Sequence, residues 1–263
     1  MNTINTAIKD YSDGLKKYEI FKTLAVFDLI QKYRRSVIGP FWVTISTLFA
    51  IIVIGPLYSK LFNQSNLAYI HYLSISFILW VWISNTLNES CNLYIESSGY
   101  LREFNLPKSI YIYRLVLKNI LIFFHNIIII IILTIFFPPQ NVLQIIYSLF
   151  GLIFLILNLI FISNIISILG ARYRDFHQIQ SNIIFLLFFI TPIMWNIDML
   201  GNKKYLAYIN PVYIYIEAIR APLLNINNEY KLIWIILIIY TIILFFISSF
   251  LFGKFKNKII YWI

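Results

Sequence analysis

From Asn119 to Ala171 the chain reads NILIFFHNIIIIIILTIFFPPQNVLQIIYSLFGLIFLILNLIFISNIISILGA, without a single Asp, Glu, Lys or Arg. A helix needs about 20 mostly apolar residues to cross the hydrocarbon core of a bilayer, and this stretch has room for two such crossings. Pro138 and Pro139 lie near its middle. Proline breaks a helix because it lacks a backbone N–H and clashes with the preceding turn. The stretch therefore predicts two membrane-spanning helices joined by a tight turn.

Four further charge-free stretches lie outside this one, and each is long enough for a single span. They run between Arg35 and Lys60, between Lys60 and Glu89, between Asp175 and Asp198, and between Lys231 and Lys254. A composition of 60% hydrophobic and 12% charged residues also lies outside the range of soluble domains. We expect one all-α integral membrane domain over residues 1–263, with six transmembrane helices. The predicted spans are residues 38–59, 69–91, 115–137, 142–169, 178–198 and 232–252.

The basic residues predict the orientation of these spans. Lys and Arg accumulate in cytoplasmic loops, and an even number of spans places both termini on the same side. Most basic residues fall on the side of the termini. Only five fall on the other side: Lys60, Lys203, Lys204, Arg220 and Lys231. We therefore expect a multi-pass protein with both termini in the cytoplasm. Topology and anionic lipid then explain the formal charge of +10, without nucleic acid as a partner.

Two segments outside the spans have a semi-apolar pattern. In residues 1–36, Ile20, Leu24, Phe27 and Ile30 recur at helical spacing opposite polar side chains, which favours an amphipathic helix on the cytoplasmic interface. The segment has no short apolar core followed by a cleavage site, so we do not interpret it as a signal peptide. The second segment, Met199–Tyr230, is interrupted by prolines and predicts short interfacial or re-entrant helices on the outer face, before the last span.

The sequence shows no pattern that indicates chemistry on a substrate. Cys91 is the only cysteine, so no disulfide or cysteine-rich zinc site is expected. Gly253-Lys254 is followed by Phe255 and lacks the upstream glycine of a phosphate-binding loop. Neither a G-x-S-x-G nor an H-E-x-x-H motif occurs. We therefore predict no catalytic, cofactor-binding or metal-binding residues, and a protein that is not itself an enzyme.

Four short motifs carry a resemblance to a known family. They are Gln31–Trp42 (QKYRRSVIGPFW), Asn88–Asn92 (NESCN), Asn105–Ser109 (NLPKS) and Ala171–Phe176 (ARYRDF). In this order and in a six-span chain they resemble the ABC-2 type polysaccharide export permeases, most closely those of the O-antigen pathway of lipopolysaccharide. The resemblance covers essentially the whole chain.

The resemblance implies a function and a set of partners. The chain is then the permease subunit of an ABC exporter in the bacterial inner membrane, which acts as a homodimer bound to two copies of a nucleotide-binding ATPase subunit. ATP and Mg²⁺ bind that partner, and the cargo is an undecaprenyl-linked polysaccharide. O-antigen is the expected cargo, with capsule and teichoic acid polymers as alternatives. A passive channel and a membrane-embedded lipid-processing enzyme are alternatives of other classes.

Family placement also makes the two short charged loops on the cytoplasmic side the coupling segments that contact the ATPase. The residues expected there are Glu96, Tyr100, Leu101, Arg102, Glu103 and Phe104 in the first segment, and Arg172, Tyr173, Arg174, Asp175 and Phe176 in the second. Ordinary positive-inside loops are the alternative interpretation of the same charges.

Polar and aromatic side chains provide two further predictions. Tyr33, Arg34, Arg35, Asn88 and Glu89 are expected at the cytoplasmic mouth of the channel, where Glu89 either pairs with Arg114 or Lys118 or contacts substrate. Tyr205, Tyr208, Tyr213 and Tyr215 are candidates for guiding an emerging glycan, because aromatic faces suit the C–H faces of sugars.

Inside the predicted spans, His125 and Asn126 interrupt an apolar run. We expect them to hydrogen-bond with Asn158 or Asn164 across two neighbouring helices.

Overall fold

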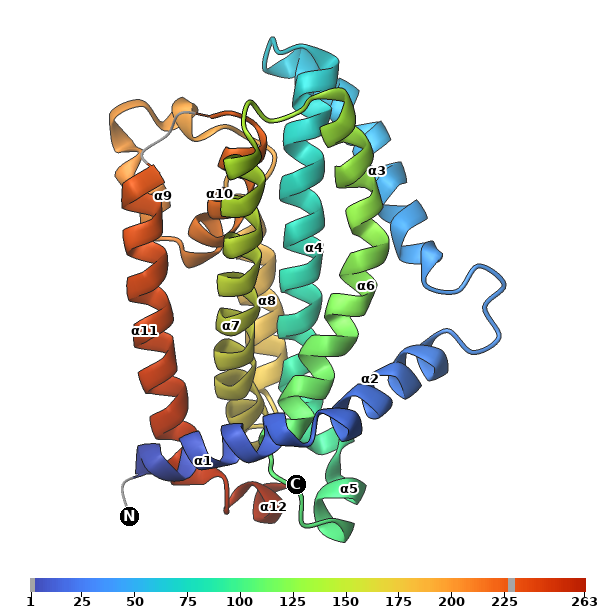
Figure 1. Cartoon of the computed structure of the whole chain (residues 1–263), viewed down its shortest axis with the longest axis vertical. Helices are drawn as coiled ribbons and strands as arrows, with labels where there is room; N and C mark the ends of the chain where they lie inside the picture. Colours follow the sequence, from blue (N-terminus) through green and yellow to red (C-terminus); the bar gives the residue numbers. More distant parts are fainter. Residues whose placement is uncertain (1–2, 227–229) are drawn as a thin grey trace.

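A computed structural model describes residues 3–226 and 230–263, and these residues form helices and connecting turns without any β-strand. Long helices stand side by side, and shorter helices gather at both ends of the bundle (Figure 1). The all-α class predicted from the sequence is therefore confirmed.

Five helices within the described residues are long and apolar enough to cross a membrane. They are α3 (Phe41–Leu61), α4 (Asn66–Glu96), α6 (Ser109–Phe136), α7 (Val142–Arg172) and α11 (Tyr230–Phe255). Pro138 and Pro139 lie in the turn between α6 and α7. Asn141 begins α7 with a capping box, in which its side chain accepts from the N–H of Gln144 and its own N–H donates to the Gln144 side chain.

The segment predicted as the fifth span, residues 178–198, is not one continuous helix. α8 (Phe176–Ile190) is followed by Thr191 in an extended conformation. Thr191 precedes Pro192, and the residue before a proline is disfavoured in the helical region because of steric clash with the proline ring. The absence of charge in residues 178–198 predicts one continuous span, but Pro192 within this stretch ends the helix at Ile190. The described helices thus supply five candidate spans where the sequence predicts six.

Short helices lie at the two ends of the bundle. At one end, α1 (Thr3–Lys16) and α2 (Tyr18–Lys32) cross beneath the long helices, next to α5 (Ser98–Glu103) and α12 (Ile259–Trp262) (Figure 1). We call this the lower end. Towards the other end lie a 3-10 helix η1 (Ile197–Lys203), α9 (Tyr205–Tyr208) and α10 (Pro211–Leu223). Of the predicted outer segment Met199–Tyr230, residues 227–229 lie outside the described part.

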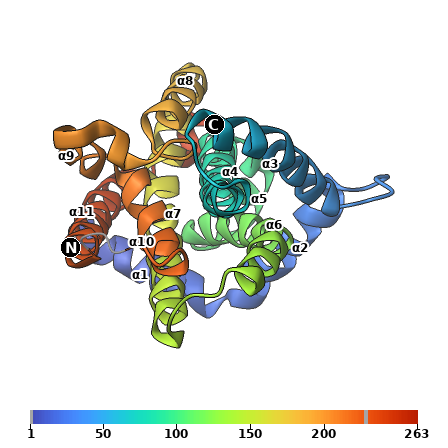
Figure 2. The same ribbon diagram turned by 90° about the horizontal axis from the view of Figure 1, so that it is seen from above.

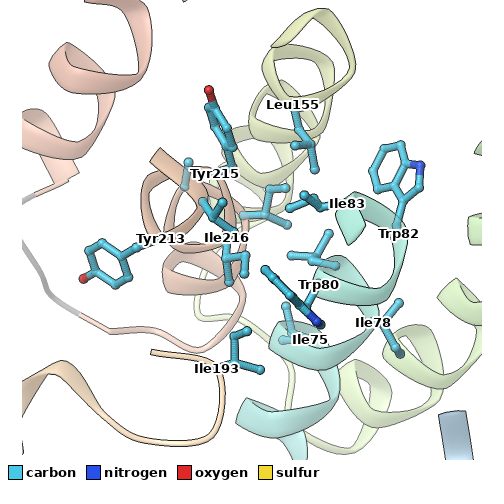
Figure 3. Packing of buried hydrophobic residues seen from close by; sticks show 14 of the residues in the cluster. Ile75, Ile78, Trp80, Trp82, Ile83, Leu155, Ile193, Tyr213, Tyr215 and Ile216 are labelled. Atoms are coloured by element: carbon cyan, nitrogen blue, oxygen red, sulfur yellow. The ribbon is translucent and has the colours of Figure 1, made fainter. Parts of the chain in front are cut away.

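The largest core surrounds α4 and α10. In α4, 67% of the most apolar 18-residue stretch is buried. In α10, every residue from Val212 to Pro222 is buried. α10 packs between α4, α7 and α11. Figure 3 shows Tyr215 and Ile216 of α10 beside side chains of α4 and Leu155 of α7. Of the interfacial or re-entrant helices predicted for Met199–Tyr230, α10 is therefore internal to the bundle, whereas α9 keeps exposed residues such as Tyr205.

Glycines allow the closest approaches between these helices. A Cβ atom on Gly170 of α7 would lie only 2.0 Å from the carbonyl oxygen of Cys91 on α4. A Cβ on Gly151 would lie 3.1 Å from the carbonyl oxygen of Ala218 on α10. Small residues at such points let helix backbones meet directly. α3, by contrast, leans away from the bundle (Figures 1 and 2), and only 17% of its apolar window is buried.

Candidate functional site

Charged side chains near the lower end attach α2 to α4 and α6. Arg114 of α6 donates to both carboxylate oxygens of Asp28 on α2, at 2.6 and 2.5 Å. Glu89 of α4 lies between two ammonium groups, with Lys118 Nζ at 3.0 Å and Lys32 Nζ at 3.1 Å. Of the partners expected for Glu89, Lys118 is observed, whereas Arg114 is bound to Asp28 instead. Charge-assisted pairs of this kind hold α2 in a defined position.

The residues expected at the cytoplasmic mouth divide into two groups. Tyr33 and Asn88 are half-buried close to Glu89, and burial raises the pKa of Tyr33 while Lys32 opposes that rise. The side-chain oxygens of both residues find no hydrogen-bond partner among the described residues. Arg34 and Arg35 are exposed in the turn after α2, where Arg35 has a φ of +71°. The structure thus brings Tyr33, Asn88 and Glu89 together and leaves the two arginines in solvent.

The first predicted coupling segment forms α5, a short helix below the bundle. Leu101 is buried, whereas Tyr100 and Phe104 are 38% and 52% exposed with their ring centroids 6.3 Å apart. The Arg114 guanidinium lies 5.5 Å from the Tyr100 ring centroid. Arg102 is exposed and donates to the carbonyl oxygen of Ile263 at 2.8 Å. The remaining residues of this segment, Glu96 and Glu103, are exposed at the ends of α4 and α5.

The second predicted coupling segment joins α7 to α8 at the same end. Tyr173, Arg174 and Asp175 are exposed, and Phe176, the first residue of α8, is half-buried. The guanidinium carbon of Arg172 lies 5.1 Å from the Tyr173 ring, 5.5 Å from the Trp262 ring and 5.9 Å from the Phe255 ring. Both segments therefore contact the C-terminal part of the chain.

The four tyrosines proposed for glycan contact do not share one environment. Tyr205 is 60% exposed and Tyr208 is half-buried, both on α9. Tyr213 and Tyr215 are buried in the core because α10 is enclosed by α4, α7 and α11 (Figure 3). In this conformation only the two α9 residues have surface to offer.

A charged pair that sequence reasoning did not single out lies inside the bundle. Arg220 and Glu217 of α10 are both buried, and Arg220 Nε donates to Glu217 at 2.9 Å. Arg220 Nη1 also donates to Ser76 Oγ at 2.7 Å and to the carbonyl oxygen of Pro192 at 2.8 Å. The sequence predicts Arg220 as one of five basic residues on the outer side, and the structure places its side chain inside the bundle and not in an exposed loop. The sequence does contain a signal for this pair. Glu217 and Arg220 carry opposite charges three residues apart in an apolar segment, and this spacing places them on the same face of a helix.

Tyrosines of α4 complete the same network. Tyr69 donates to the carbonyl oxygen of Met194 at 2.6 Å, and Tyr72 donates to that of Trp195 at 2.8 Å. The Arg220 guanidinium lies 4.2 Å from the Tyr72 ring centroid. The non-helical backbone after α8 thus receives hydrogen bonds from side chains on α4 and α10, which compensate for the helical bonds that Pro192 ends.

The expected hydrogen bonds of His125 and Asn126 with Asn158 or Asn164 are absent among the described residues. His125 Nδ1 instead lies 2.8 Å from the carbonyl oxygen of Leu121, one turn earlier. Asn158 donates to Thr241 Oγ1 of α11 at 2.8 Å. Asn164 donates to the hydroxyl of Tyr11 on α1 at 2.6 Å. Sequence reasoning identified polar groups that join helices but paired them with the wrong neighbours.

α1 is built into the lower end by further polar contacts. Burial raises the pKa of Tyr11 to about 12, so the phenol that meets Asn164 stays neutral. The hydroxyl of Ser109 donates to the backbone carbonyl of Asp10 at 2.7 Å, and Lys256 Nζ lies 3.3 Å from the Asp10 carboxylate. Burial lowers the pKa of the neighbouring Lys108, and Lys256 lowers it further while Asp10 opposes the shift.

Among residues 3–226 and 230–263, no group of three His, Cys, Asp or Glu side chains is arranged to hold a metal ion. The arrangement instead offers an exposed polar and aromatic surface at one end of a bundle of long apolar helices. A family model described as ABC-2 type transporter matches residues 19–224, which is most of the chain. The chain belongs to the ABC-2 type transporter family. Together with the five apolar helices, this makes it a multi-pass membrane protein.

Curated relatives of this ABC-2 permease are similar over most of their length. Two O-antigen export system permease proteins RfbA of Klebsiella pneumoniae are 24% and 23% identical to it. The first match covers 81% of this chain and 84% of the relative, and the second covers 92% and 93%. The protein of the same name from Myxococcus xanthus is 19% identical over 67% of this chain and 68% of its own.

Proposed function

We propose that this chain is the permease subunit of an ATP-driven exporter that moves a lipid-linked polysaccharide, with O-antigen as cargo, across the bacterial inner membrane. The observation that carries the proposal is the surface at the lower end. There α5 and the α7–α8 turn both expose aromatic and charged side chains, and both contact the C-terminal end of the chain, at Ile263 and Trp262 respectively. Membership of the ABC-2 family and similarity to O-antigen export permeases support the same function. Capsule or teichoic acid polymer is the alternative cargo.

The proposed assembly is a homodimer of this chain with two nucleotide-binding subunits, which bind ATP and Mg²⁺. The two coupling segments then contact those subunits, and an undecaprenyl-linked glycan passes between the permeases. α3 supports the homodimer because its apolar side chains, including Phe49 and Leu57, are largely exposed in the single chain. At the opposite end, Tyr205 and Tyr208 are the residues proposed to meet the emerging glycan.

We further propose six crossings in a single domain of residues 1–263, with α8 and the following non-helical segment together forming the fifth. Non-helical backbone is tolerated at membrane depth only where protein satisfies it. The hydrogen bonds from Tyr69, Tyr72 and Arg220 to this segment meet that condition. Six crossings place α1, α2, α5 and α12 on the cytoplasmic side. Tyr33, Asn88 and Glu89 then line the cytoplasmic mouth, with Arg34 and Arg35 facing the headgroups.

The central experiment is deletion of this chain in its host, followed by analysis of surface and membrane-bound glycans. We expect the surface polymer to disappear and its lipid-linked form to accumulate in the inner membrane, because synthesis continues while export stops. The polymer that disappears identifies the cargo as O-antigen, capsule or teichoic acid. An unchanged surface with altered lipid composition would instead favour a lipid-processing enzyme.

The dependence on a partner is tested with purified proteins. The chain alone is expected to release no phosphate from ATP, since it lacks a phosphate-binding loop. With its nucleotide-binding subunit, hydrolysis should appear and respond to the permease. Robust hydrolysis by the chain alone, or free passage of glycan without nucleotide, would contradict the proposed mechanism.

The proposed topology predicts which positions a membrane-impermeant maleimide can reach. Cys91 is buried, so the unmodified chain should react slowly. Lys203→Cys in η1 should be labelled in intact spheroplasts, whereas Lys258→Cys, just before α12, should react only after permeabilisation. Met1 is also expected inside, but it lies outside the described residues. Labelling of Lys258→Cys from the external side would overturn the six-crossing topology.

A further inference from the structure

The C-terminal helix α12 lies between the two predicted coupling segments. It contacts both α5 and α7 (Figure 1). Ile259 at its start is fully buried, and the rings of Trp262 and Phe255 pack with centroids 5.5 Å apart. α12 is therefore a packed part of the lower end and not a trailing segment.

One arginine from each coupling segment is used to attach α12. Arg102 of α5 donates to the Ile263 carbonyl oxygen at 2.8 Å. Arg172, at the end of α7, stands 5.5 Å from the Trp262 ring, a distance that gives a cation–π attraction. Both arginines were expected to contact the ATPase directly. Both side chains are exposed, so that prediction stays open, and their contacts with α12 point to an additional positioning role in which α12 joins the two segments.

The same helix presents a large aromatic side chain to solvent. Tyr261 is 86% exposed, more than Tyr100, Phe104 or Tyr173 of the coupling segments. It follows directly after Ile260 and precedes Trp262, whose ring packs beside Arg172 and Phe255, so the backbone that carries Tyr261 is anchored to the lower end. Exposed aromatic residues at the centre of a protein surface are typical anchors of protein–protein interfaces.

We propose that α12 is a third element of the surface that binds the nucleotide-binding subunit, with Tyr261 as its anchor and with Arg102 and Arg172 holding the three elements in one platform. This inference rests on the proposed function. The occupant is the ATPase subunit because the α12 surface is continuous with α5 and the α7–α8 turn, which that subunit is proposed to bind.

Photocrosslinking of the whole complex tests the contact. A benzophenone side chain is introduced at position 261, at position 100 as a coupling-segment reference, and at position 205, which is also exposed but at the other end. Crosslinks to the nucleotide-binding subunit are expected from 261 and 100 and not from 205. A crosslink from 100 without one from 261 would overturn the third contact alone. Failure of the wild-type proteins to copurify would overturn the proposed function, and the third contact with it.

The positioning role is tested by a matched pair of variants. Trp262→Ala removes the ring beside Arg172, and loss of a cation–π contact of about 1 kcal/mol is expected to weaken subunit binding about five-fold. Trp262→Phe keeps an aromatic face and should restore most of the affinity. Membrane content of the permease should match the wild type in both, with a small loss of thermal stability in Trp262→Ala, which loses its contacts with Arg172 and Phe255, and none in Trp262→Phe. Equal affinity for all three proteins, or equal loss in both variants, would overturn the role.

Discussion

Replacing Arg220 with methionine is expected to lower the free energy of unfolding by about 3–5 kcal/mol, because it breaks the buried ion pair between Arg220 and Glu217 by removing one partner. The same change removes the donors to Ser76 and to the Pro192 carbonyl oxygen, so the segment after α8 loses its attachment to α10. Thermal unfolding of the purified permease in detergent measures the effect. Export should fall with the amount of folded protein.

Two further variants separate the buried charge from a general effect of mutation. Changing Glu217→Leu together with Arg220→Met removes both charges and is expected to recover part of the lost stability. Lys204→Ala breaks an ion pair with Asp198 in which both side chains are substantially exposed, and it should change the melting temperature little. If Arg220→Met were as mild as Lys204→Ala, the buried network would not be what holds this region together.

Replacing Tyr100 and Phe104 together with alanine is expected to weaken binding of the nucleotide-binding subunit by about 1,000-fold, since aromatic anchors at interface centres are each worth about 2 kcal/mol, or about 4 kcal/mol for the pair. Surface glycan should fall accordingly. Insertion should be unaffected because both side chains lie outside the long helices, in α5 and its C-terminal cap. The paired measurement is the ATPase recovered per permease and the polymer on the cell surface.

Phe150→Ala is the matched control, because Phe150 is 50% exposed but lies on α7, away from the lower end. Tyr100→Phe keeps the ring beneath the Arg114 guanidinium and should behave nearly as the wild type. Normal association and export in the double alanine variant would mean that α5 is only a solvated connection.

Local sequence features predict the parts of this fold that depend on one stretch of chain. The charge-free run from Asn119 to Ala171 and its two prolines predict a pair of long helices with a turn between them, and α6 and α7 end and begin around that turn. The end of α8 at Ile190 also depends on local sequence, because Thr191 is followed by Pro192. The absence of charge in this stretch does not reveal that end.

Contacts between distant residues account for most of what the sequence could not predict. Nothing in the sequence of α10 indicates that Arg220 contacts Ser76 and Pro192, which lie far away in the chain. The same residues would be compatible with an arginine in an outer loop. Likewise, Asn164 was recognised as a polar group in a span, but its partner Tyr11 lies on a helix that sequence patterns place at the interface. The coupling residues are predicted as segments, whereas the contacts of Arg102 and Arg172 depend on α12, which lies far away in the sequence.

The contacts of Gly170 and Gly151 determine where this permease has room to move. At Gly170 α7 meets the backbone of α4 with no space for a methyl group, since a Cβ there would lie 2.0 Å from the Cys91 carbonyl oxygen. At Gly151 a Cβ would lie 3.1 Å from the carbonyl oxygen of Ala218 on α10, which is a tight but less restrictive contact. α3 also approaches α4 closely at Gly55, where a Cβ would lie 2.7 Å from Cγ1 of Ile70, but only 17% of its most apolar stretch is buried in the chain. α4, α7 and α10 are therefore joined by close helix contacts, whereas α3 is the least buried of the five apolar helices and has the most freedom to shift against them.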